Sequence, residues 1–184
     1  METDEHLAKR LQDGDKNALA TLVTRHHAPL IGYLYRMSGG NRALAEDMTQ
    51  EAFLRVIRAI DQYHYPRPFK AWLYTIATNL IRDHYKRAET RYATVDVDSA
   101  TLAATHGKPE THIERQDDAQ QVVDALMTLP ETHRAVVVLR YYQELPLNDI
   151  ADILDIPTGT VKSRLSNGLK KLRQALEKDY SHEP

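Results

Sequence analysis

The residues best suited to binding chemistry lie between Thr158 and Lys178. This stretch contains six lysines and arginines but only one acid, Glu177. Apolar residues recur from Val161 to Leu176 at helical spacing, so this stretch is predicted to be an amphipathic helix with a basic, polar face. Such a face suits nucleic acid, because long cations contact phosphates while short polar side chains near the helix N-terminus reach base edges. The candidate residues are Thr158, Thr160, Lys162, Ser163, Arg164, Asn167, Lys170, Lys171 and Arg173.

A shorter amphipathic helix is predicted just before this one, with apolar positions from Leu147 to Leu154. Pro157 ends that pattern, Thr158 can cap the next helix, and Ala151 is small enough for two helices to cross closely. Two helices joined by a tight corner form a helix-turn-helix. The alternative is an ordinary amphipathic hairpin whose cationic face is simply solvated, but the corner favours DNA binding.

Aromatic and basic residues are interleaved in a second stretch, which comprises a proline-containing loop and a helix predicted over residues 69–87. Interleaved residues of these types can stack unpaired bases while following their phosphates. The alternative is that Phe69 and Trp72 are core anchors and that the cations are solvated. The apolar face is predicted to bury Phe69, Trp72, Leu73, Ile76 and Leu80, and the other face to expose Tyr74, Thr78, Arg82 and Tyr85.

A helix predicted over residues 43–60 carries polar residues and one leucine opposite its apolar face: Asp47, Gln50, Glu51 and Leu54. A leucine among carboxylates is typical of a protein-contact surface, although a single exposed leucine is also common. We interpret this face as a docking surface. Upstream, a helix is predicted over residues 17–37, with a kink or restart at Pro29.

Composition limits the remaining possibilities. The net charge of −2 over 184 residues means that affinity for nucleic acid has to come from local patches, and the absence of cysteine excludes disulfides and thiol chemistry. No apolar run could span a membrane and no signal peptide is present, so a cytoplasmic protein without membrane insertion is expected. The nine histidines are scattered, so neither a metal site nor an enzyme is predicted. Few glycines and prolines and little strand-like alternation indicate an all-α protein.

Three segments resemble, in the same order, the sigma-70 family of bacterial sigma factors, in the extracytoplasmic-function subgroup with σ2 and σ4 domains. They are AEDMTQEAFLRVIRAI (45–60), FKAWLYTIATNLIRDHYKR (69–87) and LPETHRAVVVLRYYQELPLNDIADILDIPTGTVKSRLSNGLKKLR (129–173). The resemblance implies a σ2-like helical bundle over 1–92, a flexible linker over 93–116 and a four-helix σ4-like domain over 117–184. It also implies core RNA polymerase (β′ coiled coil and β flap), promoter DNA and a separate anti-sigma factor as partners, and no cofactor.

The family's functional positions carry over residue by residue. Asp47, Gln50 and Glu51 match the surface that contacts core polymerase, in agreement with the docking surface that also contains Leu54. The basic face of the last helix matches the −35 reader, and Arg134 and Arg140 are expected to contact phosphates. Asn79 matches a −10 reader, and the loop before residue 69 matches a pocket that captures a flipped base. The full −10 set is Tyr63, His64, Tyr65, Arg67, Phe69, Asn79, Arg82, Lys86 and Arg87.

The chain also departs from the family pattern. Asp155 stands where the corner often has glycine, and aspartate tolerates the left-handed backbone required there. The −10 loop has Pro66-Arg67-Pro68 where a glycine and an acid are common, which leaves the identity of the captured base open. The linker acids Asp96 and Asp98 are expected to mimic nucleic-acid charge in the polymerase channel. A stand-alone helix-turn-helix regulator remains the alternative function, because such proteins share the C-terminal motif.

Overall fold

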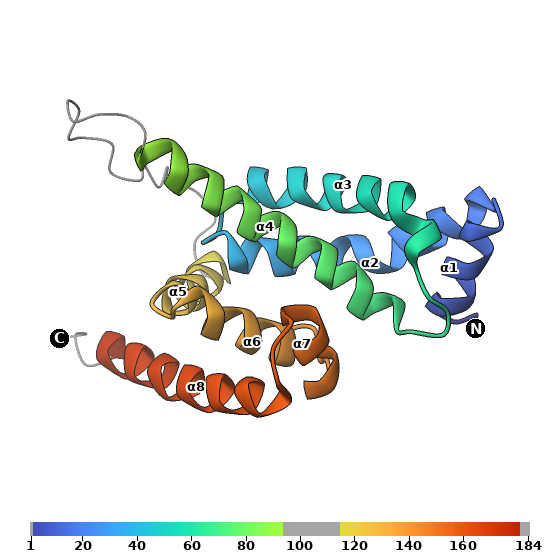
Figure 1. Cartoon of the computed structure of the whole chain (residues 1–184). Helices are drawn as coiled ribbons and strands as arrows, with labels where there is room; N and C mark the ends of the chain where they lie inside the picture. Colours follow the sequence, from blue (N-terminus) through green and yellow to red (C-terminus); the bar gives the residue numbers. More distant parts are fainter. Residues whose placement is uncertain (1, 94–114, 181–184) are drawn as a thin grey trace.

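The computed structural model describes residues 2–93 and 115–180, and every regular element in these ranges is a helix (Figure 1). The predicted all-α fold is confirmed. Most of the predicted linker, including Asp96 and Asp98, lies outside the described residues. The elements are α1 (Asp4–Gln12), α2 (Lys16–Met37), α3 (Arg42–Ala59), the 3-10 turn η1 (Ile60–Gln62), α4 (Phe69–Ala93), α5 (Arg115–Met127), α6 (Glu131–Tyr141), α7 (Leu147–Leu154) and α8 (Thr158–Tyr180).

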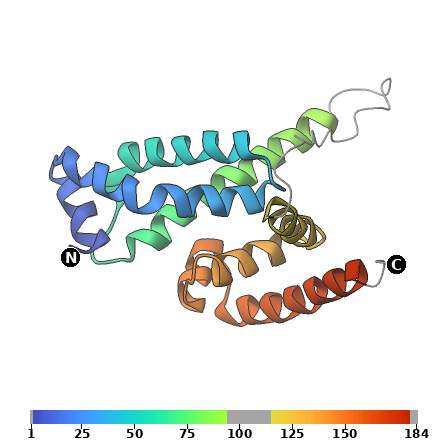
Figure 2. The ribbon, with the colours of Figure 1, turned by 180° about the vertical axis from the view of Figure 1, so that it is seen from behind.

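Helices α1–α4 form the N-terminal half, in which α2, α3 and α4 pack lengthwise and α1 closes one end (Figures 1 and 2). Side-chain caps define where these helices begin, because the first turn of a helix has backbone N–H groups without partners. At the start of α2, Asp15 Oδ1 accepts a hydrogen bond from the N–H of Asn17 at 2.9 Å. At the start of α3, Asn41 Oδ1 accepts a hydrogen bond from the N–H of Leu44 at 3.0 Å. The core between the helices is apolar and includes Leu22, Leu30, Leu34, Ala52, Val56, Leu73 and Ala77.

Helix α2 continues through Pro29, so the predicted restart there does not occur. The proline ring is exposed, which leaves water available to the carbonyl of Arg25, the group that a proline nitrogen cannot satisfy. Leu22 before the proline and Leu30 and Leu34 after it remain buried along one stripe. The apolar stripe therefore outweighs the local cost of the proline.

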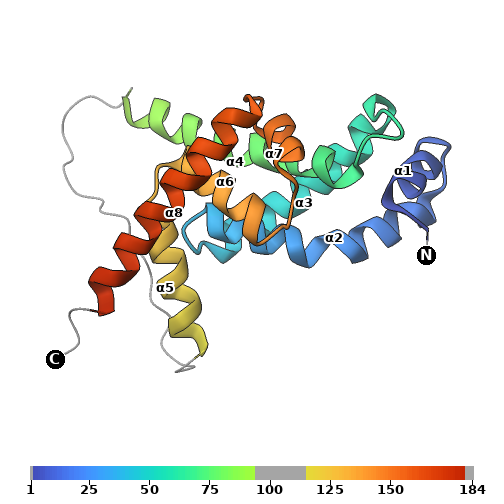
Figure 3. The same ribbon diagram turned by 90° about the horizontal axis from the view of Figure 1, so that it is seen from below.

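Helices α5–α8 form the C-terminal half around the buried Val136, Leu139, Ile150, Leu154 and Val161. Helix α8 contacts α5, α6 and α7 and, within the described ranges, no helix of the N-terminal half. Its outer face therefore points away from the rest of the molecule (Figure 3). Gly168 allows the close approach of α8 to α6, since a Cβ at this position would lie 3.0 Å from a methyl group of Val137.

The two halves pack directly on each other, mainly through α4 against α7 and α2 against α6. Gln143, which is buried, joins them: its Nε2 donates to the Pro29 carbonyl at 3.3 Å, and its Oε1 accepts from the Tyr74 hydroxyl. Lys70 donates to the Gln143 carbonyl at 2.6 Å, and Arg82 forms an ion pair with Glu131 at 3.3 Å. We call this arrangement the closed state.

Candidate nucleic-acid interface

The corner between α7 and α8 has the geometry of a helix-turn-helix. Asp155 ends α7 in the left-handed region, with φ 52° and ψ 53°, and the N–H of Ile156 bonds to the Ala151 carbonyl at 3.1 Å. The Pro157 carbonyl accepts from the N–H groups of Thr160 and Val161 at the start of α8. The sequence predicted that Thr158 caps α8, but it is instead the first residue of the helix. Its hydroxyl lies 3.4 Å from Asn148 Oδ1.

Replacing Asp155 with glycine is expected to stabilise the protein slightly. A side chain in the left-handed region is strained, and aspartate only partly escapes that strain. The Asp155 side chain is exposed, so its removal creates no cavity. We expect Asp155→Gly to change the free energy of unfolding by about 0.5 kcal/mol in the stabilising direction, because the relieved strain of about 1–2 kcal/mol exceeds the cost of about 0.4–1 kcal/mol from glycine's freedom in the unfolded chain. Urea unfolding measures this change, and a loss of 1 kcal/mol or more, on the order of a lost helix cap, would contradict it.

The outer face of α8 presents the side chains expected there. Lys162, Ser163, Asn167, Lys170, Lys171 and Arg173 are exposed, while Thr158, Thr160 and Arg164 are half-buried. Positive charge also reaches the neighbouring helix: burial, and then the cations Lys171 and Arg164, lower the pKa of His133. A row of cations beside short polar groups is the arrangement that a helix needs to lie in a DNA groove.

In the closed state Arg134 does not lie where a phosphate could reach it, contrary to the expectation from the sequence. Its side chain is buried, and the guanidinium donates to the carbonyls of Met37 at 3.1 Å and Leu129 at 3.2 Å. Met37 is the last residue of α2, so Arg134 satisfies a carbonyl that the helix end leaves without a partner. Arg140 is exposed and donates to the Leu145 carbonyl at 2.9 Å, so it remains a candidate for phosphate contact.

The loop of residues 63–68 exposes some of its predicted base-contacting side chains and buries others. His64, Tyr65 and Arg67 are exposed. Tyr63 and Phe69 are buried against each other and against Trp72, with ring centroids 5.4–6.0 Å apart. Burial also raises the pKa of Tyr63 to about 12. The expectation that Tyr63 and Phe69 contact a base is therefore corrected: they form the aromatic floor of the loop.

Helix α4 exposes Asn79, Lys86 and Arg87 but not all of the face predicted to point outward. Tyr74 and Thr78 are fully buried, and Tyr85 and Arg82 are half-buried. The Thr78 hydroxyl lies 2.8 Å from that of Tyr33 on α2, and Tyr74 reaches Gln143 of the C-terminal half. That prediction was wrong because α2 and the C-terminal half together cover this side of α4.

The docking surface predicted on α3 is exposed as expected at Asp47, Gln50 and Leu54, and Glu51 is half-buried and paired with Arg55 at 3.1 Å. Sequence reasoning missed Ile57, which is 44% exposed beside Leu54 at 45%. The spacing in the sequence could have revealed Ile57, since it lies three residues after Leu54 and residues three apart on a helix share a face. We call Asp47, Gln50, Glu51, Leu54 and Ile57 the α3 face.

The residues that the structure describes contain no group of three His, Cys, Asp or Glu side chains that could hold a metal ion. No helix among them has both the length and the apolar character needed to cross a membrane. The arrangement instead offers two separate cationic or aromatic surfaces, on α8 and on the loop with α4, together with the α3 face.

Comparison with known proteins places these surfaces in a family. Residues 22–91 match Sigma-70 region 2 and residues 125–174 match Sigma-70, region 4. The chain is 35% identical over 180 residues to the ECF RNA polymerase sigma factor SigW of Bacillus subtilis (strain 168), covering 91% of this chain and 94% of that protein. It is 31% identical over 172 residues to the ECF RNA polymerase sigma-E factor of Escherichia coli (strain K12), covering 89% and 88%.

The fold is also similar to a solved structure, that of CnrH in complex with the cytosolic domain of CnrY. The TM-score is 0.75 at 24% identity, over 97% of this chain and 99% of that one. The order of surfaces along the chain, the two matched regions and the similarity over nearly the whole length agree. The chain belongs to the sigma-70 family of RNA polymerase sigma factors, in its extracytoplasmic-function subgroup.

Proposed function

We propose that this chain is an alternative sigma factor that binds core RNA polymerase and directs promoter-specific transcription initiation. In this proposal the α3 face docks on the β′ coiled coil and the C-terminal half contacts the β flap. The loop of residues 63–68 and the exposed part of α4 read the −10 element, and the outer face of α8 reads the −35 element. The protein acts in the cytoplasm and by binding, with no catalytic group of its own.

One observation carries the proposal: the helix-turn-helix occurs together with a region-2 half that exposes both the α3 face and the loop with α4. A stand-alone helix-turn-helix regulator, the alternative function, has no use for either surface. Two weak DNA-reading modules on one chain gain affinity when a large partner fixes their separation, because linking raises their effective concentration.

The closed state supports a further part of the proposal, namely that the two halves separate when the polymerase binds. The −35 and −10 elements are about 25 base pairs apart, on the order of 85 Å at about 3.4 Å per base pair. A compact chain of 184 residues is only about 40 Å across. The closed state therefore cannot span a promoter, even though the α8 face and Asn79 are both exposed in it.

Run-off transcription tests the proposed function directly. Purified protein is mixed with core RNA polymerase, separated on a sizing column and supplied with fragmented DNA of the source organism. Co-elution with core and discrete transcripts are the expected results. Sequence-selective binding to duplex DNA by the protein alone, without binding to core, would favour the stand-alone regulator.

Asn79→Ala is expected to weaken open-complex formation by about tenfold, because one amide that reads a base edge is worth about 1–3 kcal/mol. Permanganate reactivity of unpaired thymines measures the open complex. Asn17→Ala is the matched control, since Asn17 is also an exposed asparagine but lies near the start of α2, outside the proposed site. Core binding should be unchanged in both variants, and its loss in Asn79→Ala would count against the assignment.

A separate anti-sigma factor is part of the proposal. CnrH was solved with the cytosolic domain of CnrY, and the sigma factor RpoE of Bartonella quintana with the anti-sigma factor NepR. We propose that a protein of this class holds the present chain away from polymerase. A pull-down from the source organism with the tagged full chain, analysed by mass spectrometry, would identify it.

A further inference from the structure

We propose that helix α1 is a brace that holds the loop of residues 63–68 in the shape that receives a promoter base. This inference rests on the proposed function of that loop in −10 recognition. Helix α1 ends at Gln12, and the match to Sigma-70 region 2 begins only at residue 22. The family match therefore gives α1 no role, whereas its contacts do.

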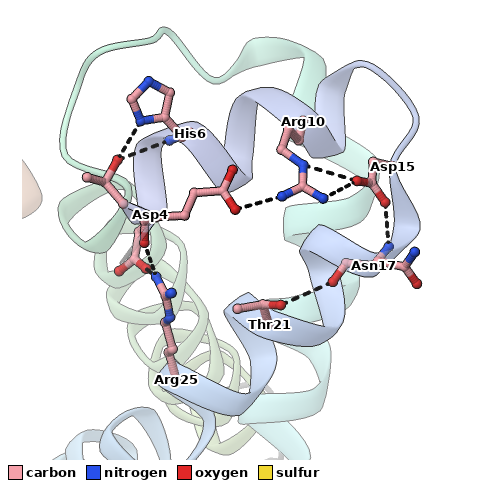
Figure 4. A network of polar contacts seen from close by, with 9 residues as sticks. Asp4, His6, Arg10, Asp15, Asn17, Thr21 and Arg25 are labelled. Carbon is pink, nitrogen blue, oxygen red and sulfur yellow. Dashed lines mark hydrogen bonds and ion pairs between the residues drawn. The ribbon is translucent and has the colours of Figure 1, made fainter.

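Helix α1 is fixed to α2 at both of its ends (Figure 4). At its start, the Asp4 carboxylate accepts from Arg25 at 2.6 Å and lies 2.7 Å from His26 Nε2. Near its end, Arg10 forms an ion pair with Asp15, the residue that caps α2. Leu7 and Ala8, which lie between these contacts, are buried. Helix α1 therefore has a set position from which it can hold another segment.

From this position α1 holds both ends of the loop. Gln12 Nε2 donates to the carbonyl of Ile60 and to that of Tyr63, each at 2.7 Å, where the chain enters the loop. At the other end, the N–H of Phe69, the first residue of α4, donates to Glu5 Oε1 at 3.2 Å. A helix N-terminus favours a carboxylate, because its backbone N–H groups lack partners and carry partial positive charge.

The middle of the loop has a third contact with α1. The Tyr65 hydroxyl lies 3.2 Å from His6 Nε2, and the two rings are 5.5 Å apart. Tyr65 is nevertheless 48% exposed, and its neighbours His64 and Arg67 are also exposed. The backbone is thus tied down while the side chains that would meet a base remain accessible.

Because these contacts fix the backbone of the loop, they lower the cost of capturing a base. Extracting a base from the duplex is unfavourable, and a loop that also had to become ordered would add to that cost. A preformed loop avoids the added cost and fixes which base shape it accepts. Gln12 and Glu5 are therefore positioning residues: they touch no DNA and act through the backbone of residues 60–69.

The test uses holoenzyme assembled from core polymerase and the full chain. Binding to a fluorescent single-stranded oligonucleotide with the non-template −10 sequence is measured, and each base is then changed in turn. Gln12→Met keeps the length of the side chain but removes both N–H donors. We expect it to weaken binding by about fivefold and to flatten the preference at one base position. Glu5→Met, at the other end of the loop, is expected to do the same.

Two controls separate positioning from general stability. Gln12→Lys restores N–H donors at similar reach and should recover the wild-type base preference. Lys9→Met alters an exposed ion pair with Asp13 on the same helix and should have no effect. If Gln12→Met no longer binds core, Glu5→Met decides the question. Wild-type affinity and base preference in the Met variants, or an equal loss in Gln12→Lys, would overturn the brace. A wild-type holoenzyme with no base preference at all would instead overturn the proposed role of the loop.

Discussion

A cleavable cross-link between the two halves is expected to silence promoter-dependent transcription until the link is cut. The sequence contains no cysteine, so Tyr35→Cys and Gln120→Cys introduce the only two thiols. The Tyr35 hydroxyl on α2 donates to Gln120 Oε1 on α5 at 3.3 Å, which lets a short bismaleimide with an internal disulfide join the two helices. We expect run-off synthesis to fall by at least about tenfold and to return on reduction.

The reason lies in the length of the promoter and in the contacts of the closed state. A ligand that binds only the open form binds more weakly by the fraction of molecules able to open, and the cross-link takes that fraction towards zero. Gln143, Arg134 and Lys70 hold the halves together through hydrogen bonds, several of them to backbone carbonyls. Arg134 is buried, and no carboxylate of the described residues forms an ion pair with it, which is costly for a cation and leaves the closed state able to open.

Control variants show whether transcription is lost because the two halves are linked or because the reagent modifies the protein. Each single-cysteine variant is treated with the same reagent. Cysteines at Lys9 in α1 and at Asp13, the residue that caps its end, form an exposed pair one turn apart. A link between them stays within the N-terminal half and should leave transcription unchanged. Wild-type transcription from the chain linked between positions 35 and 120 would show that the closed state reads promoters as it stands, and the proposed separation of the halves would be wrong.

Local patterns predicted the helices and several surfaces because each depends on neighbours in the chain. The spacing of the apolar positions from Leu147 to Leu154 predicted the buried side of α7, where Ile150 and Leu154 lie. The exposed leucine of the α3 face was visible on a helical wheel for the same reason. Periodicity is reliable where one face meets the core and the other meets water.

Contacts between distant parts of the chain were not predictable in this way. A helical wheel separates the faces of α4 but does not say that Thr78 meets Tyr33 on α2 or that Tyr74 meets Gln143 in the C-terminal half. Arg134 was expected to contact phosphate because of its place in the family resemblance, yet its partner Met37 lies 97 residues away. Tyr63 and Phe69 show the same limit, since an aromatic residue serves equally well as a loop floor or as a stacking surface.

Leu54→Glu is expected to abolish stable binding to core polymerase. Leu54 and Ile57 place two large apolar side chains, 45% and 44% exposed, on the α3 face. Contact surfaces concentrate binding energy in a few such residues, and the loss of one costs about 2 kcal/mol or more, about thirtyfold in Kd. A charge introduced there adds a desolvation cost on top of the lost contact. Fluorescence anisotropy of labelled protein titrated with core measures the affinity.

The exposure of Leu54 makes this prediction specific to binding. Because the side chain already contacts water, the substitution should leave the thermal midpoint of unfolding nearly unchanged. Arg42→Glu is the matched control, since it adds the same carboxylate to an exposed position near the start of α3. If Leu54→Glu bound core as tightly as Arg42→Glu, the α3 face would have to serve another partner. Ile57→Glu should behave like Leu54→Glu, because both side chains belong to one contact surface even though only Leu54 was evident from the sequence.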